Sequence, residues 1–356
     1  MARVLMLVHG MGVHGPDWAT DLMIDLTTAA TAYGLDGDFS DELHDDKVML
    51  APISYDGRFV KWVEKWGNDS RELAKFIRQN AIDMPVNLIE WLDSADETEN
   101  NFVWSHVVDV LLYRFFNLVT TDVRVHVARD VATLWRDALE VDPNAEVSVL
   151  AHSLGTSVTH DTLALLATDP PAGAEGFLAG AVRLANLFQV ANVSRILETS
   201  PKVFDSVISP PSVRGDKAYC GNFFNVRHRL DPFTAPRSFS PSWGGDDFVQ
   251  VGTKAVRDFN VHDIGHYVRD PRVHIPLFRA LFGFEAIDQT TANDAIDAYD
   301  NEKRSSCPEV LAAFVQDCAQ RVQVIEDSSD IKTLIAAGVH FLMDVQEVQK
   351  ACGGVF

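Results

Sequence analysis

The chain has 356 residues, 47% of them hydrophobic, which is enough for one large domain or two ordinary ones with a substantial core. Its 51 acidic and 30 basic residues give a formal charge of −21, and such a surface repels nucleic-acid phosphates and anionic lipid headgroups. The four cysteines form no CxxC pair, so the sequence predicts neither a disulfide framework nor a zinc site, and it indicates a reducing, cytoplasmic compartment.

The first predicted element is a buried strand at residues 3–8, "RVLMLV", which ends in "HGMGVHG". This apolar run is too short for a signal peptide and lacks a small-residue cleavage pattern. No other stretch is long and apolar enough to predict an integral membrane segment. A helix is predicted over residues 18–33, and the acidic loop "DGDFSDELHDD" then leads to a second strand at residues 48–54.

Residues 55–120 differ from the segments on either side, because they combine helical spacing with many large apolar side chains and lack strand-like alternation. We interpret them as a helical insertion. Its aromatic residues are most simply core-facing. The alternative is a cap that covers a pocket and binds an acyl chain.

A helix is predicted over residues 123–141, followed by a strand at 147–151 and a second helix that ends near 167. A weaker apolar segment at 179–193 precedes a strand at 219–228, "FVQVG" at 248–252, and "NVHDIGHYV" at 260–268. The last core helix is predicted at 273–282 with Pro276 in its first turn, and residues beyond 285 are helical and acidic. Strands separated by helices predict an α/β fold, with a mostly parallel sheet covered on both faces.

The most informative motif is "VSVLAHSLGTSV", where a predicted strand meets a predicted helix at Ser153. A sharp strand-to-helix turn exposes the serine hydroxyl at a helix N-terminus and needs small residues two places away on each side. Ala151 and Gly155 meet that requirement. The alternative is that Ser153 is only an N-cap.

A nucleophilic serine needs a base and a group that orients the base. Asp231 ends a strand and precedes a proline, so we predict that it is the acid, although an Asp-Pro pair is also a common turn-former. We predict His262 as the base and keep His266 as the alternative base. The rival acids, Asp258 and Asp263, lie close to the histidines rather than at the end of the preceding strand.

Other histidines, including His160 and His274, are interpreted as structural. Two backbone amides are predicted to form an oxyanion hole, that of Leu154 after the serine and that of Met11 in the Gly-rich turn. This turn could instead hold a phosphate, but it lacks the lysine and hydroxyl residue of a P-loop, and no acidic ribose ligand follows it.

"LVHGMG", "VLAHSLGTSVTHDTL", "RLDPF" and "VHDIGHYV", in this order, resemble the α/β-hydrolase superfamily. The chain is similar to serine esterases and lipases with an "HSLG" nucleophile elbow, over about residues 2–55 and 120–285. The resemblance implies an eight-stranded sheet from which the first two strands are missing here. "HDIGHY" resembles a histidine-plus-tyrosine pattern of some lipases, in which the histidine five places before the tyrosine is the base, and this favours His262.

We therefore expect a hydrolase core at residues 1–285, a cap or lid insertion at 55–120, and a helical C-terminal extension at 286–356. The expected activity is hydrolysis of a small-molecule or lipid-like carboxylic ester through an acyl-enzyme intermediate, without a metal or cofactor. The same triad would also serve a peptidase, an amidase or an acyltransferase. The non-enzymatic alternative is an interaction module with a hydrolase fold. The sequence leaves the substrate and the oligomeric state open.

Overall fold

The computed structural model describes the core of the chain, and its described residues are 1–11, 17–44, 46–66, 109–110, 113–114, 117–195, 197, 203–231, 233–234, 238–257, 260–302, 313–314, 316–317 and 320. Most of the predicted insertion, Asp258 and nearly all of the chain beyond residue 302 lie outside these residues. The expectations of a cap and of a helical C-terminal extension therefore stay predictions.

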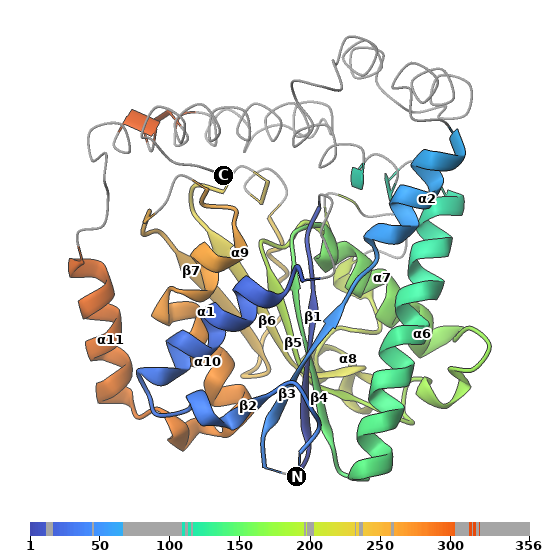
Figure 1. Ribbon diagram of the computed structural model, residues 1–356, viewed down its shortest axis with the longest axis horizontal. Helices are drawn as coiled ribbons and strands as arrows, with labels where there is room; N and C mark the ends of the chain where they lie inside the picture. Colours follow the sequence, from blue (N-terminus) through green and yellow to red (C-terminus); the bar gives the residue numbers. More distant parts are fainter. Residues whose placement is uncertain are drawn as a thin grey trace.

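A seven-stranded sheet forms the centre of the described structure (Figure 1), and its order is β2-β3-β1-β4-β5-β6-β7. The strands are β1 (Arg3–Val8), β2 (Phe39–Ser40), β3 (Val48–Ile53), β4 (Glu146–His152), β5 (Leu184–Val190), β6 (Cys220–His228) and β7 (Phe248–Thr253). Every neighbouring pair is parallel, which confirms the predicted α/β class. The predicted acidic loop contains one strand that was not expected, the two-residue β2.

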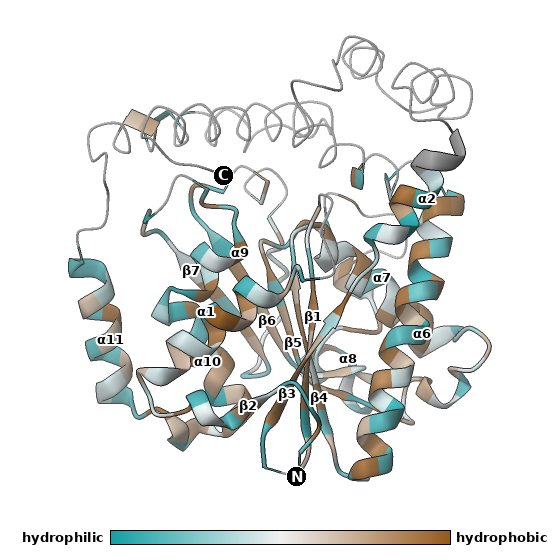
Figure 2. Ribbon diagram, in the orientation of Figure 1, coloured by the Kyte–Doolittle hydropathy of each residue, from teal (hydrophilic) through white to brown (hydrophobic). Residues whose placement is uncertain are grey.

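Successive residues of each strand face opposite sides of the sheet, and both sides are apolar. In β1, Val4 and Met6 contribute to one core, whereas Leu5 and Leu7 contribute to the other. This is why a continuous apolar run, rather than an alternating one, forms this strand. Figure 2 shows the apolar colouring of the central strands, with polar residues on the outer faces of the helices.

Helices cover both faces of the sheet (Figure 1). Their bounds are α1 (Thr20–Thr31), α2 (Asp56–Trp66), α6 (Asn117–Val141), α7 (Leu154–Thr168), α8 (Pro211–Arg214), α9 (Ile264–Val268), α10 (Pro271–Phe282) and α11 (Gln289–Asn301). The core with Val4 contains buried residues of α6 and α7, and the core with Leu5 contains those of α1 and α10. Short 3-10 helices lie at Asp36–Asp38, Glu175–Phe177, Val203–Asp205, Gly215–Lys217 and Phe284–Ala286. Within the described ranges, no helix is long and apolar enough to cross a bilayer.

The predicted start of the last core helix was wrong. Helix α10 begins at Pro271, after Asp270, whose side chain accepts a hydrogen bond from the backbone N–H of Arg272. The proline of the first turn is thus Pro271, where a missing N–H costs nothing, and Pro276 lies inside the helix. An N-capping aspartate followed by proline was the signal for this boundary.

Candidate active site

The site lies where the order of strands reverses direction. Strand β1 has β3 as its neighbour on one edge and β4 as its neighbour on the other. Strands that precede β4 in the chain are added on the first side of β1, and β4 and later strands are added on the second side. In open parallel sheets, ligands bind at the carboxyl ends of strands beside such a switch point. The loop after β1 carries Gly10 and Met11, and the turn after β4 carries Ser153, so the topology brings these two predicted segments together.

Ser153 occupies a backbone conformation that residues with a side chain rarely adopt. Its φ is 52° and its ψ is −124°, between the last residue of β4 and the first residue of α7. The conformation is held by a hydrogen bond from the Ser153 N–H to the Val190 carbonyl at 3.0 Å. Although Ser153 is at the N-cap position, its side chain makes no capping hydrogen bond, so the N-cap alternative does not explain this serine.

Two glycines allow the loop after β1 to press against the turn at Ser153. A Cβ on Gly155 would lie 2.1 Å from the His9 carbonyl oxygen, closer than any real contact. A Cβ on Gly10 would lie 2.9 Å from His152 Nδ1 and 3.0 Å from Ser153 Cβ. The requirement for a small residue at position 155 is therefore confirmed, and its cause is the close approach of another backbone.

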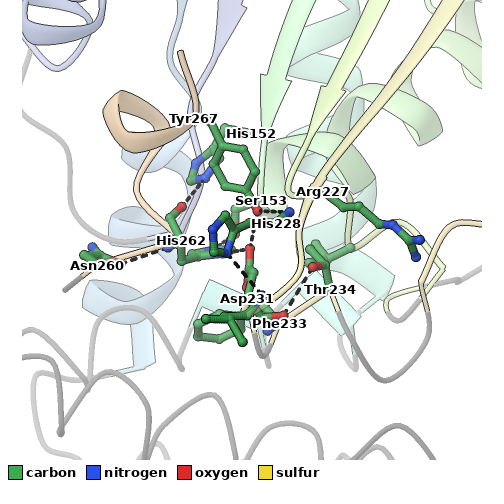
Figure 3. A network of polar contacts seen from close by, with 12 residues as sticks. His152, Ser153, Arg227, His228, Asp231, Phe233, Thr234, Asn260, His262 and Tyr267 are labelled. Atoms are coloured by element: carbon green, nitrogen blue, oxygen red, sulfur yellow. Dashed lines mark hydrogen bonds and ion pairs between the residues drawn. The ribbon is translucent and has the colours of Figure 1, made fainter. Parts of the chain in front are cut away.

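Ser153, His262 and Asp231 form a continuous chain of hydrogen bonds (Figure 3). His262 Nε2 lies 2.8 Å from Ser153 Oγ, and His262 Nδ1 lies 2.8 Å from Asp231 Oδ2. The three side chains are at most 7% exposed. They come from positions 109 and 31 residues apart along the chain. An imidazole that bridges a hydroxyl and a carboxylate in this way can accept the hydroxyl proton while its other N–H stays bound to the carboxylate.

Asp231 is fully buried and is compensated by three donors. Its Oδ2 accepts hydrogen bonds from His262 Nδ1 and, at 2.7 Å, from the Tyr267 hydroxyl, and its Oδ1 accepts from the Phe233 N–H at 2.9 Å. Burial by itself raises the pKa of this carboxyl. The charge interaction and hydrogen bond with His262, followed by the bonds from Tyr267 and Phe233, outweigh burial, so the pKa of Asp231 is held below its usual value. The carboxylate is thus ionised where it meets His262.

Tyr267 is a part of the site for which the sequence analysis assigned no contact. Its hydroxyl donates to Asp231 and accepts a hydrogen bond from the His228 N–H at 3.0 Å. Burial, and then the neighbouring Asp231 charge, raise the pKa of Tyr267 well above its usual value, so the hydroxyl stays protonated and remains a donor. The only signal in the sequence was the spacing of "HDIGHY", which gives no partner for the tyrosine.

His266, the alternative base, lies in a different environment. Its Nε2 accepts a hydrogen bond from the Arg257 N–H at 3.2 Å, and its ring meets that of His228 edge-on at 5.3 Å. Burial, followed by the neighbouring His228 charge, lowers the pKa of His266 to about 3. Among the described residues, His262 and not His266 contacts Ser153. The rival acid Asp263 caps α9 by accepting from the N–H groups of Gly265 and His266.

His262 lies in a turn, and His152 fixes its backbone. His152 Nε2 donates to the His262 carbonyl at 2.7 Å. Behind the loop after β1, the Tyr55 hydroxyl lies 2.8 Å from the His9 carbonyl oxygen and 2.9 Å from that of Gly10. These contacts were not anticipated, because a sequence gives no sign of which carbonyl a buried side chain will reach. Among the described residues, His160 contacts Asp161, and His274 contacts Tyr33, Val268 and the ring of Phe278.

A cavity of about 510 Å³ opens beside Ser153 and His262, between α1 and α9. Its lining combines apolar groups, including Met11 and Trp18, with the carboxylates of Asp21, Asp25 and Asp263. Asp25 is held in an ion pair with Arg269, at 2.9 Å from each of two guanidinium nitrogens. Met11 lies on this cavity, and Leu154 is the first residue of α7, where backbone N–H groups have no partner within the helix. Within the described part of the chain, no group of three metal-ligating side chains is present.

Comparisons with protein-family models, with curated proteins and with solved structures find no match to this chain. The class that the fold defines is therefore an α/β protein with a seven-stranded, all-parallel sheet. Its function has to be inferred from the groups at the carboxyl edge of that sheet.

Proposed function

We propose that the protein is a serine hydrolase that cleaves a carboxylic ester through an acyl-enzyme intermediate. The observation that carries this proposal is the pair of 2.8 Å contacts that join Ser153 Oγ to His262 and His262 to Asp231. They lie on a cavity large enough for a small ester, within the usual size of small-molecule sites. The resemblance to α/β-hydrolases rests on the same residues.

In the first half of the proposed reaction, Ser153 Oγ attacks the ester carbonyl carbon as its proton passes to His262 Nε2. The imidazolium is stabilised by the ionised Asp231, which accepts the Nδ1–H. The Leu154 and Met11 amides are proposed to donate to the oxyanion of the tetrahedral intermediate. When that intermediate collapses, the bond to the leaving oxygen breaks and His262 returns the proton to the alcohol.

In the second half, water attacks the acyl-enzyme. His262 takes a proton from the water and gives it to Ser153 Oγ as the carboxylic acid leaves. The overall reaction consumes one water and regenerates the serine. Each proton transfer uses His262 Nε2, which explains why the other ring nitrogen must be held by Asp231 throughout.

The test is covalent labelling of the purified full chain with a fluorophosphonate, read by intact mass and peptide mapping. We expect one adduct per chain on Ser153, lost in Ser153→Ala, and turnover of short p-nitrophenyl esters that falls by about 10⁴-fold or more in this variant. Thr159→Ala is a matched control, because Thr159 is a buried hydroxyl residue of α7 outside the proposed triad. A folded chain that stays unlabelled and inactive would support a non-catalytic module instead.

A further inference from the structure

A second cavity lies at the carboxyl ends of β6 and β7, and its charge is opposite to that of the protein as a whole. Its volume is about 310 Å³, and none of its nine lining residues is acidic. Four of them are cations: Arg227, Arg229, Lys254 and Arg272. We call this cavity the cationic pocket. These four cations contrast with the chain as a whole, whose net charge is −21.

Three of the four cations are available to a ligand. Arg227, Arg229 and Lys254 are exposed, and across the described ranges of the chain none of them forms an ion pair. The fourth, Arg272, is neutralised by ion pairs with Asp270 and Asp300. The pocket therefore carries positive charge that the described residues do not balance.

A glycine leaves open space in the lining of the pocket. Arg227, near the end of β6, is paired in register with Gly252 of β7. Gly252 lines the pocket, and a Cβ added to it would meet nothing within 4 Å. The absence of a side chain at this position leaves space beside the Arg227 side chain. Figure 3 shows Arg227 beside Thr234 and directed away from His262 and Asp231.

We propose that the cationic pocket binds the phosphate group of a small ligand. Arginine guanidinium groups bind phosphate oxygens through paired N–H donors, and lysine adds a compact charge. The carboxyl ends of parallel strands are also where open α/β sheets bind ligands. The proposal does not depend on the hydrolase proposal, because the pocket shares no lining residue with the cavity at Ser153.

The test is calorimetric titration of the full chain with inorganic phosphate and, separately, with glycerol 3-phosphate, in phosphate-free buffer at low salt. We expect one site per chain, with an affinity that falls as salt is added. Tighter binding of glycerol 3-phosphate would show that the pocket also contacts the glycerol group. Equal binding of the two ligands would show that the pocket binds the phosphate group alone. Absence of binding by both, or tighter binding of citrate than of either, overturns the proposal.

Two variants locate the site. The pocket triple variant, Arg227→Gln/Arg229→Gln/Lys254→Gln, should weaken phosphate binding at least tenfold. The control triple variant, Lys61→Gln/Arg129→Gln/Lys217→Gln, removes the same charge from exposed positions elsewhere and should change phosphate binding less than twofold. Gly252→Glu leaves every cation in place and puts a carboxylate in the open space, and it should also weaken binding at least tenfold. Equal losses in the pocket triple and the control triple would mean that only net charge matters and would overturn the assignment. Because the readout is binding, the result is independent of esterase activity.

Discussion

His262 and His266 lie four residues apart, on either side of the start of α9, and both are almost completely buried. His262 bonds Ser153 with one ring nitrogen and the ionised Asp231 with the other. His266 accepts from a backbone N–H and packs against a second buried histidine, His228. One imidazole thus joins a hydroxyl to a carboxylate, whereas burial holds the other neutral. Burial alone does not identify a site, because the partners of each ring nitrogen decide what it can do.

The largest expected effect is the difference in Ser153 reactivity between variants of the two histidines. His262→Gln should reduce fluorophosphonate labelling of Ser153 by about 10³-fold or more, because the base is lost. His266→Gln should keep the labelling rate within a few-fold, since His266 does not contact Ser153. Time courses of labelling by mass spectrometry measure both. If the two variants lose labelling equally, the proposed assignment of His262 as the base is wrong.

Gly155 allows the loop after β1 to approach the turn that places the Ser153 hydroxyl beside His262. Gly155→Ala should lower the free energy of unfolding by about 3 kcal/mol or more, because its Cβ would lie 2.1 Å from the His9 carbonyl oxygen. Gly57→Ala is the matched control. Position 57 lies in α2 with nothing within 4 Å of an added Cβ, and alanine favours a helix. Urea denaturation followed by fluorescence measures both, and equal stability of the two variants would contradict the close approach of the loop after β1.

Tyr267 sharpens the comparison, because it bonds the same carboxylate oxygen as His262. Tyr267→Phe should cost about 2–3 kcal/mol at pH 7 and slow the labelling of Ser153, because a hydrogen bond to a charged group is lost. The lowered pKa of Asp231 stabilises the fold above the unfolded value of about 3.9, and this contribution is lost as the pH falls through the folded pKa. The cost of Tyr267→Phe should therefore shrink as the pH falls from about 3.9 through the folded pKa of Asp231.

The control for this prediction is Tyr219→Phe, which removes a buried hydroxyl that donates to the Phe177 carbonyl. Tyr219→Phe should lower the free energy of unfolding by about 1 kcal/mol at neutral and at acidic pH alike. It should leave the labelling of Ser153 unchanged. Denaturant curves at pH 7 and at a series of pH values below about 3.9 give both stabilities. A cost of Tyr267→Phe that stays constant with pH would mean that the tyrosine does not stabilise the ionised carboxylate.

The smallest expected effect is the pH dependence of stability that His266 introduces. Its folded pKa of about 3 lies below the ordinary value of 6.5, so only the unfolded chain gains a proton as the pH falls through this range. The contribution of His266 to the free energy of unfolding is thus complete above pH 6.5 and is lost progressively as the pH falls toward 3. The loss between pH 7 and pH 5 should be about 2 kcal/mol, because the slope approaches 1.4 kcal/mol per pH unit below pH 6.5.

His266→Gln should flatten the stability profile by about that amount over this interval, because glutamine can accept the Arg257 hydrogen bond without titrating. The control is His44→Gln, which makes the same substitution at an exposed position. Stability measured by urea denaturation from pH 7 to pH 5 decides the point. An unchanged slope in His266→Gln would show that this histidine is not held neutral by the fold.

The sequence by itself determined the α/β class and placed Ser153 at the junction of a strand and a helix. These features depend on neighbours along the chain: apolar runs predict buried parallel strands, and small residues at positions 151 and 155 permit the sharp turn. The same local signals predict the N-terminus of α10 wrongly, because a proline in the first turn fits both Pro276 and Pro271, and the helix begins at Pro271 after the capping Asp270.

Only the tertiary structure decided which histidine meets Ser153, that Tyr267 shares the Asp231 carboxylate, and that Arg227, Arg229 and Lys254 line one cavity. Each of these contacts joins groups that are distant in sequence. A shift of one turn by a single residue would point its side chains in other directions. His262 and His266 lie in the same short segment, and only a resemblance in spacing favoured His262. The packing of α9 against β6 and the burial of Asp231 separate them, because a carboxylate in the interior is stable only where donors converge on it.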